Sequence, residues 1–307
     1  MTGLDFGTLV LGGNVFGWTA DREESFRILD AFVAAGGKSI DTADVYSAWA
    51  EGNSGGESET IIGEWLASRG NRESVVLATK VFQHPQRPGL SPGNVRQAIE
   101  DSLRRLRTDY VDLYYAHRDD PDVPQEEYIA VFDELVRAGK AREVGATTFT
   151  AARLRSAVKI AKDNGLTPFT VSQDPYNLVE RGIEADVLPA VQELGLVELP
   201  YWSLASGFLT GKYRPGKEVD SVRAGKAAGY LDEPRNLMLL GLLDELAAER
   251  GVSMAAVALA WLRTRPAVPA PIASARTVEQ LPALVESMNL DLTADEIVAL
   301  NDASSRG

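Results

Sequence analysis

The feature that most constrains the fold of this chain is a regular alternation of short apolar, β-branched runs with longer segments of helical period. This pattern is typical of βα units, in which the strands of a parallel sheet are joined by helices. Each strand candidate is followed by a helix candidate. The eight strand candidates are residues 8–11, 39–41, 75–79, 111–115, 143–147, 170–173, 196–200 and 267–272.

Capping residues mark several of the predicted helix starts, namely Asp21 with Glu24, Ser91 before Pro92, and Thr293 with Glu296. No linker rich in Pro or Ser divides the chain, and the segment GGNVFG at residues 12–17 lacks the glycine spacing of an open dinucleotide-binding sheet. We therefore expect an α/β fold, a single (β/α)8 TIM barrel domain over residues 1–307. Its functional residues should lie where the strands end.

Composition narrows the range of functions. The chain has no cysteine and only two histidines, His84 and His117, so we expect no metal site of thiolate or histidine ligands. A net charge of −13 argues against nucleic acid and anionic membranes as partners. The N-terminal segment has no basic n-region, and apolar runs are too short for a membrane span. These features predict a cytoplasmic protein.

Four polar residues stand at or just beyond neighbouring predicted strand ends. Asp41 ends the second strand with Tyr46 beyond it, Lys80 ends the third, and His117 follows the fourth. Each could be structural by itself, but a tyrosine beside an ammonium can supply a proton, because the ammonium stabilises the phenolate and lowers the tyrosine pKa. Asp41 would pair with Lys80, and His117 would orient a carbonyl oxygen. The set predicts the reduction of a carbonyl.

Three long segments resemble the aldo-keto reductase superfamily. They are GGKSIDTADVYS followed by GESETIIGEWL, then LATK, and then VRQAIEDSLRRLRTDYVDLYYAH. The resemblance covers almost the whole chain and implies a catalytic tetrad at Asp41, Tyr46, Lys80 and His117. It further implies an NADPH cofactor extended across the barrel mouth and a small-molecule aldehyde, ketone or keto sugar as substrate.

The resemblance also implies a set of cofactor-binding residues. Those near the nicotinamide and pyrophosphate are Thr147, Thr148, Gln173, Tyr201, Leu204, Ser206, Gly207 and Lys212, and those near the adenosine 2′-phosphate and adenine are Ser274, Arg276 and Gln280. Three departures from the family pattern suggest weaker binding of the cofactor than is typical of the family. Thr148 replaces an amide, Trp202 and Ser203 replace a Ser-Pro pair, and Ala283 and Leu284 replace a Glu-Asn pair that holds adenine.

The ribbon of residues 207–236 carries Lys212, Arg214, Lys217 and Arg223 and could fold over the cofactor as a basic clamp, or remain a solvated loop. Gln280 could contact adenine, or form a capping box with Thr277. Arg276 favours NADPH over NADH. For the substrate pocket we expect the aromatic residues near strand ends, which are Trp18, Trp49, Phe82 and Trp202.

Two other functions compete with a reductase. Some relatives in this family bind the cofactor but serve as regulatory subunits, so an NADPH-binding regulatory subunit without turnover is the first alternative. The second is an unrelated barrel hydrolase that uses Asp41 and Glu59 as paired carboxylates. Glu59 lies on the predicted second helix, which argues against the hydrolase.

Overall fold

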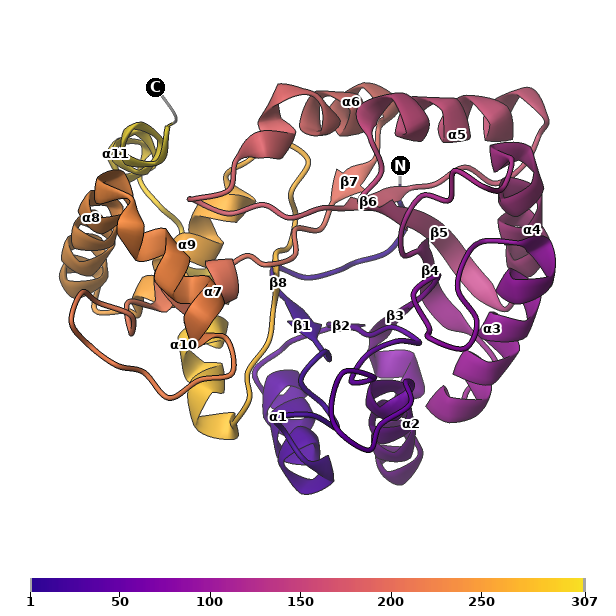
Figure 1. Cartoon of the computed structure of the whole chain (residues 1–307), viewed down its shortest axis with the longest axis horizontal. Helices are drawn as coiled ribbons and strands as arrows, with labels where there is room; N and C mark the ends of the chain where they lie inside the picture. The colour runs from indigo at the N-terminus through magenta and orange to yellow at the C-terminus, as the bar shows by residue number, and fades with distance from the viewer. Residues whose placement is uncertain (1, 306–307) are drawn as a thin grey trace.

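Eight parallel strands form the centre of the molecule in the computed structural model, which describes residues 2–305 (Figure 1). The strands follow the order β7-β6-β5-β4-β3-β2-β1-β8, so each pairs with its neighbour in the chain and β1 pairs with β8. Their bounds are β1 Val10–Gly12, β2 Ser39–Asp41, β3 Val76–Val81, β4 Val111–Ala116, β5 Ala141–Thr147, β6 Val171–Gln173, β7 Val197–Glu198 and β8 Ile272–Ala273. This topology confirms the predicted (β/α)8 barrel.

Two backbone hydrogen bonds join the segments of β7 and β8, where the ladder order has its ends. Glu198 N donates to Ala267 O over 2.8 Å, and Ile272 N donates to Pro200 O over 2.8 Å. Because open sheet edges expose unpaired N–H and C=O groups, these bonds close the ring. The strands' carboxyl ends then face one common mouth.

Helices surround the sheet, and Figure 1 shows α3 and α4 beside the middle strands and α7 to α11 grouped on the far side, beyond β8. The first six helices each connect two consecutive strands. They are α1 Arg22–Ala34, α2 Glu57–Arg69, α3 Pro92–Leu106, α4 Gln125–Arg137, α5 Ala151–Asp163 and α6 Val187–Leu194. The others are α7 Ala224–Ala228, α8 Pro234–Arg250, α9 Met254–Arg263, α10 Leu281–Val285 and α11 Ala294–Ser304. No helix within residues 2–305 is long and apolar enough to cross a membrane.

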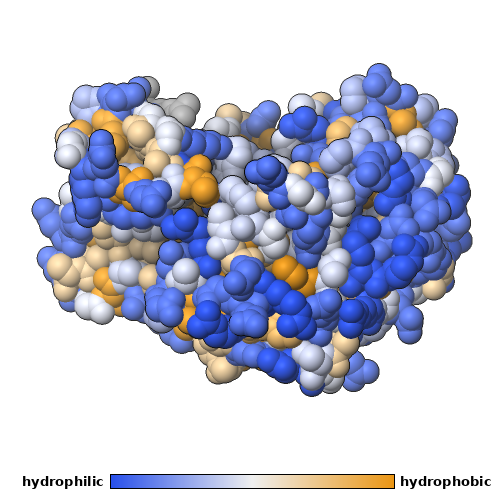
Figure 2. Space-filling view, turned by 60° about the horizontal axis from the view of Figure 1, so that its bottom comes forward, coloured by the Kyte–Doolittle hydropathy of each residue, from blue (hydrophilic) through white to orange (hydrophobic). Residues whose placement is uncertain are grey.

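The core has two parts because successive strand side chains point to opposite faces. On β4, Leu113 and Tyr115 belong to the small cluster inside the barrel, whereas Tyr114 belongs to the larger cluster between sheet and helices. The Tyr114 ring packs against Phe132 of α4 with ring centroids 5.5 Å apart. The outer surface is mainly hydrophilic, with small scattered hydrophobic patches on the face in Figure 2.

Most of the predicted helix caps are found, whereas one cap and the bounds of the last strand differ from the prediction. Thr293 and Glu296 form a complete capping box and Asp21 accepts from Glu24 N, but Ser91 makes no side-chain cap. The strand expected at 267–272 forms only at its end, at Ile272–Ala273. Prolines at positions 269 and 271 cannot donate to a ladder, and Ala267 has a left-handed φ of 63°, so the earlier residues are not a regular strand.

Hydrogen bonds to a buried carboxylate join the second and third βα units. The carboxylate of Glu59 on α2 accepts from Thr79 Oγ1 (2.5 Å) and from Arg105 Nε of α3 (2.6 Å). Asp44, in the loop after β2, is also buried, but no described residue donates a hydrogen bond to its carboxyl oxygens. Burial, and then the charge of Glu59, raises the pKa of Asp44 to about 8. Asp44 is therefore mainly protonated at neutral pH.

This shift predicts how stability depends on pH. The unfolded chain loses the Asp44 proton near pH 3.8, whereas the folded protein keeps it up to about pH 8, so Asp44 lowers stability as pH rises through that window. The Asp44→Asn variant has no titratable group at this position, so its stability lacks this pH dependence. We expect its Tm, measured by calorimetry, to rise relative to wild type on going from pH 5 to pH 8.

The matched control is Asp5→Asn, because Lys38 lowers the pKa of exposed Asp5 and the carboxylate is charged in both states over this range. Its Tm difference from wild type should stay constant between pH 5 and pH 8. A difference that is equally constant for Asp44→Asn would contradict the assignment of a protonated Asp44.

Candidate active site

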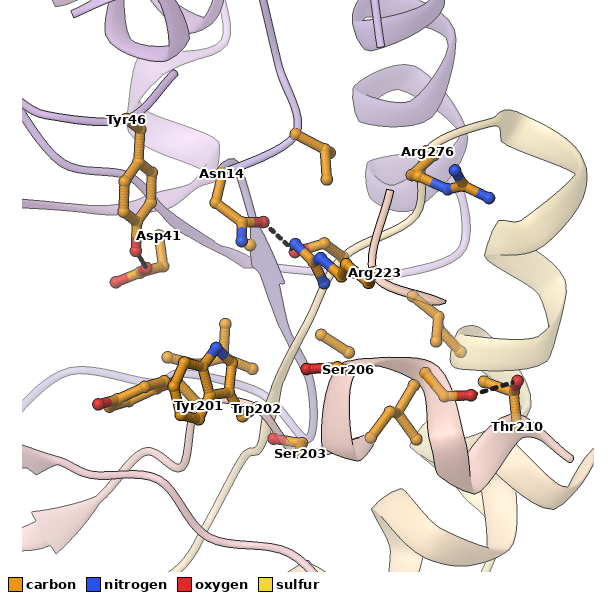
Figure 3. Close-up of a pocket in the computed structure, with 18 of the residues that line it drawn as sticks. Asn14, Asp41, Tyr46, Tyr201, Trp202, Ser203, Ser206, Thr210, Arg223 and Arg276 are labelled. Carbon is orange, nitrogen blue, oxygen red and sulfur yellow. Dashed lines mark hydrogen bonds between the residues drawn. The ribbon is translucent and has the colours of Figure 1, made fainter. Parts of the chain in front are cut away.

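A cavity of about 570 Å³ opens at the carboxyl ends of the strands. It is elongated, and Figure 3 shows Tyr46 and Asp41 at one end, Arg276 at the other and Arg223 between them. Tyr201 and Trp202 form the opposite wall at the tyrosine end (Figure 3). The cavity lies where a (β/α)8 barrel carries its functional groups.

Lys80 on β3 organises the tyrosine end of the cavity. Its side chain is fully buried, and its three N–H groups all have acceptors. Nζ donates to Asp41 Oδ2 (2.6 Å), to the backbone oxygen of Thr42 (2.9 Å) and to Tyr46 Oη (2.9 Å). Burial lowers the pKa of Lys80, against the opposing effect of Asp41. These three bonds hold the ammonium in one orientation, in which one N–H points at the Tyr46 phenol oxygen.

Tyr46 comes from the loop after β2, and its hydroxyl lies 3.3 Å from Asp41 Oδ2, to which it donates. Burial first, and then the Asp41 charge, raises the pKa of Tyr46 well above its ordinary value. The expected lowering of this pKa by Lys80 is therefore not found, because burial and then the Asp41 carboxylate, which accepts from the same phenol, oppose the phenolate. The phenol is therefore neutral and carries its proton at working pH.

His117 follows β4 and is fixed through its backbone. Its N–H donates to Val81 O (2.9 Å), and its carbonyl oxygen accepts from Thr147 Oγ1 (2.7 Å). Burial, followed by the charge of Lys80, lowers the pKa of the imidazole well below its ordinary value, so the ring is neutral. The ring lies 6.0 Å from that of Tyr46, and its buried Nδ1 has no partner among the described residues. A neutral ring next to the phenol can donate one N–H to a bound oxygen.

Every residue predicted to bind the cofactor lines this cavity, namely Thr147, Thr148, Gln173, Tyr201, Leu204, Ser206, Gly207, Lys212, Ser274, Arg276 and Gln280. At the tyrosine end, Gln173 Nε2 donates to Asp41 Oδ1 (3.0 Å), which links β6 to the Lys80 network. Thr148 has a left-handed φ of 57°, and its hydroxyl lies 3.3 Å from Tyr201 Oη. Thr148, which replaces an amide residue of the family pattern, thus contacts Tyr201, the tyrosine expected to stack against the nicotinamide.

Two side chains at the other end are already bonded within the protein. Ser274 Oγ donates to Asn14 Oδ1 over 2.8 Å. Gln280 Oε1 accepts from Arg276 N (3.1 Å), so the predicted capping box with Thr277 is wrong. The sequence analysis did not predict Asn14, which lines the cavity two residues after β1, although its place near a strand end was a signal.

The cations of the ribbon are divided between the cavity and the surface. Lys212 and Arg223 line the cavity with Arg276, and none of these three makes an ion pair within the described chain. Burial and the charge of Arg276 lower the pKa of Arg223. Arg214 instead pairs with Asp244, and Lys217 does not line the cavity. Only two of the four predicted ribbon cations, Lys212 and Arg223, therefore face the cavity. Arg223 is half-buried and has no ion pair within the described chain, which suits a phosphate group.

Of the four aromatic residues predicted to line the substrate pocket, two line the cavity and two do not. Trp49 and Trp202 line the cavity and are 49% and 42% exposed. Trp18 does not line it but packs edge-on against Trp49, with ring centroids 5.6 Å apart. Phe82 is also wrong as a lining residue, because it packs against the hydrophobic core. Glu59, the second carboxylate of the hydrolase alternative, is held by Thr79 and Arg105 away from the cavity.

Residues 6–305 match the aldo/keto reductase family. The uncharacterized oxidoreductase YrpG of Bacillus subtilis (strain 168) is 36% identical, over 98% of this chain and 93% of its own length. Norsolorinic acid reductase stcV of Emericella nidulans is 34% identical, over 97% and 77%. Aryl-alcohol dehydrogenase [NADP(+)] of Phanerodontia chrysosporium is 32% identical, over 92% and 77%.

The buried ion pair at the tyrosine end gives a prediction on stability. Removing one partner of a buried pair leaves an uncompensated charge, which costs about 3–5 kcal/mol, whereas replacing both is often nearly neutral. We expect Asp41→Asn to lower the free energy of unfolding by about that amount in urea titrations. The double variant Asp41→Asn/Lys80→Met should recover most of the loss. Additive losses in the double variant would contradict an energetically coupled pair.

Proposed function

Because this chain belongs to the aldo/keto reductase family and is an NAD(P)H-dependent oxidoreductase, we propose that it reduces an aldehyde or ketone to an alcohol with NADPH and with Tyr46 as the proton donor. One observation carries the proposal. The Lys80 ammonium donates at once to Asp41 and to Tyr46 Oη, at 2.6 Å and 2.9 Å. We further propose that a single barrel domain carries the whole reaction.

The chemistry divides between the cofactor and the protein. NADPH, when bound, supplies the hydride that forms the new C–H bond at the carbonyl carbon. Tyr46 gives its proton to the carbonyl oxygen, which completes the alcohol and leaves a phenolate. Lys80 stabilises that phenolate because its N–H already points at Oη. The phenolate then regains a proton from solvent, so one hydride and one proton are consumed per carbonyl.

His117 would position the substrate rather than supply the proton. Its pKa lies well below the ordinary value, so an imidazolium is not available at neutral pH. A neutral imidazole can still donate one N–H to the carbonyl oxygen and direct that oxygen toward the phenol. We assign His117 this role, with Asp41 as the residue that holds Lys80 in place.

The residues around the cavity fit a dinucleotide. Thr148 lies beside Tyr201 and Gln173 bonds Asp41, so these residues would hold the nicotinamide, with Tyr201 stacked against it. Lys212 and Arg223, which have no ion pair within residues 2–305, would meet the pyrophosphate, and Arg276 the 2′-phosphate. The name of the relative aryl-alcohol dehydrogenase [NADP(+)] supports NADPH over NADH.

The Tyr46→Phe variant tests the proton donor. Since general acid catalysis contributes about 10²- to 10⁴-fold, we expect kcat to fall by that range, measured by NADPH absorbance with a panel of aldehydes and ketones. The variant should bind NADPH as wild type does, as measured by quenching of tryptophan fluorescence. A wild type that binds NADPH but oxidises it with no carbonyl would favour a regulatory subunit. A variant as active as wild type would remove Tyr46 from the proposed role.

The Arg276→Ala variant tests the choice of cofactor. A charge-assisted contact between an arginine and a phosphate contributes about 1.5–3 kcal/mol, so we expect the KM for NADPH to rise roughly tenfold to a hundredfold. The KM for NADH, which has no 2′-phosphate, should change little. Arg276→Lys is the matched control and should keep part of the preference. Equal losses for both cofactors would separate Arg276 from the 2′-phosphate.

A further inference from the structure

We infer that Arg118 makes this enzyme selective for aromatic carbonyl substrates that carry a carboxylate on the ring. The inference rests on the proposed carbonyl reduction and names the substrate class for the same site. It depends on where Arg118 lies, on what its acidic neighbours already bind, and on the aromatic walls around it.

Arg118 directly follows His117 at the end of β4, and it lines the cavity with an exposed side chain. Burial and Lys80 lower the pKa of His117, and the Arg118 charge adds to that effect; burial raises the pKa of Tyr201, and Arg118 opposes that rise, so the guanidinium is within electrostatic reach of both rings. Arg118 is thus at the tyrosine end, where the reacting carbonyl would sit.

The acidic residues that could neutralise Arg118 are bound elsewhere. Asp119 accepts two hydrogen bonds from Arg153, at 2.6 Å and 2.9 Å, and a third from Tyr128 Oη at 3.0 Å. Asp120 accepts from the backbone N–H groups of Leu90 (2.7 Å) and Asp122 (3.1 Å). In a chain of net charge −13, Arg118 nevertheless takes part in no ion pair within the described residues. An unpaired guanidinium beside the site is available to an anion.

The cofactor does not need this cation. Lys212, Arg223 and Arg276 are assigned to its phosphates, and Figure 3 shows Arg223 and Arg276 away from Tyr46, toward the other end of the cavity. Arg118 instead follows His117 in the chain and lines the same cavity. An anion held by Arg118 would therefore belong to the substrate.

Two indole rings make the surroundings suitable for an aromatic ring. Trp49 packs edge-on against Tyr46 (6.1 Å between ring centroids), and Trp202 packs edge-on against Tyr201 (5.3 Å). Both indoles line the cavity and are more than two-fifths exposed, and the Lys226 ammonium lies over the Trp202 ring, 3.0 Å from its centroid. Aromatic rings gain from stacked or edge-on contact with such surfaces. A substrate ring between these walls would carry its aldehyde at Tyr46 and its carboxylate at Arg118.

The test compares charged and neutral substrates of similar size. The kcat/KM is measured with 3- and 4-formylbenzoate and with their methyl esters, for wild type, Arg118→Gln, Arg118→Lys and Lys162→Gln. The last variant removes an equal charge from an exposed lysine on α5 that does not line the cavity. The measured quantity is the ratio of kcat/KM for the acid to that for its ester, so that intrinsic reactivity cancels between variants.

We expect Arg118→Gln to lower this ratio about tenfold, mainly through the KM of the acid, because a charge-assisted bond is lost. Arg118→Lys should recover part of the ratio, Lys162→Gln should leave it unchanged, and 0.5 M salt should reduce the difference. A ratio in Arg118→Gln equal to that of wild type for both isomers would overturn the inference.

A binding measurement keeps the inference separate from the proposed turnover. Tryptophan fluorescence of the NADP⁺ complex is titrated with benzoate and with benzamide, neither of which is reduced. Weaker binding of benzoate relative to benzamide in Arg118→Gln than in wild type supports the inference even if no aldehyde is reduced, an outcome that would refute only the proposed reduction. Equal relative binding in the two proteins refutes the role of Arg118.

Discussion

The ion pair between Lys80 and Asp41 is the interaction on which the site depends. A fully buried ammonium is tolerated because all three of its N–H groups meet oxygen atoms, two of them on the segment Asp41–Thr42 and one on Tyr46. The second oxygen of Asp41 accepts from Gln173, so the network extends from β2 and β3 across the barrel to β6. Its geometry is therefore fixed by the closed sheet rather than by any one loop.

The two rings beside this pair are uncharged for different reasons. Tyr46 and His117 are both neutral, the first because burial and Asp41 oppose the phenolate, the second because burial and Lys80 oppose the imidazolium. The cavity thus holds a proton donor and a neutral hydrogen-bond donor around one fixed positive charge. Three residues beyond Asp41, the buried Asp44 carboxyl accepts no hydrogen bond from residues 2–305 and stays protonated up to about pH 8.

The cavity is positive at both ends, although the protein as a whole is strongly acidic. Lys212, Arg223 and Arg276 have no ion pair within residues 2–305, and neither does Arg118 at the tyrosine end. A local concentration of cations in a concave site attracts anionic ligands against an unfavourable net charge. The proposed cofactor and the inferred substrate are both anions, so the same electrostatic field would serve both.

The sequence by itself determined the barrel and the residues at its mouth, because strand periodicity and strand ends are local patterns that parallel topology brings to one face. Asp41, Tyr46, Lys80 and His117 were all found in this way. Only the tertiary structure decided which hydrogen-bond partners and which packing contacts are formed between residues that are distant in the sequence. It bonds Ser274 to Asn14, 260 residues away, packs Phe82 against the core and raises rather than lowers the Tyr46 pKa. It also leaves Arg118 without an ion pair among residues 2–305, next to two aspartates that accept hydrogen bonds from other residues. Hydrogen-bond partners and burial depend on long-range packing, which no local pattern records.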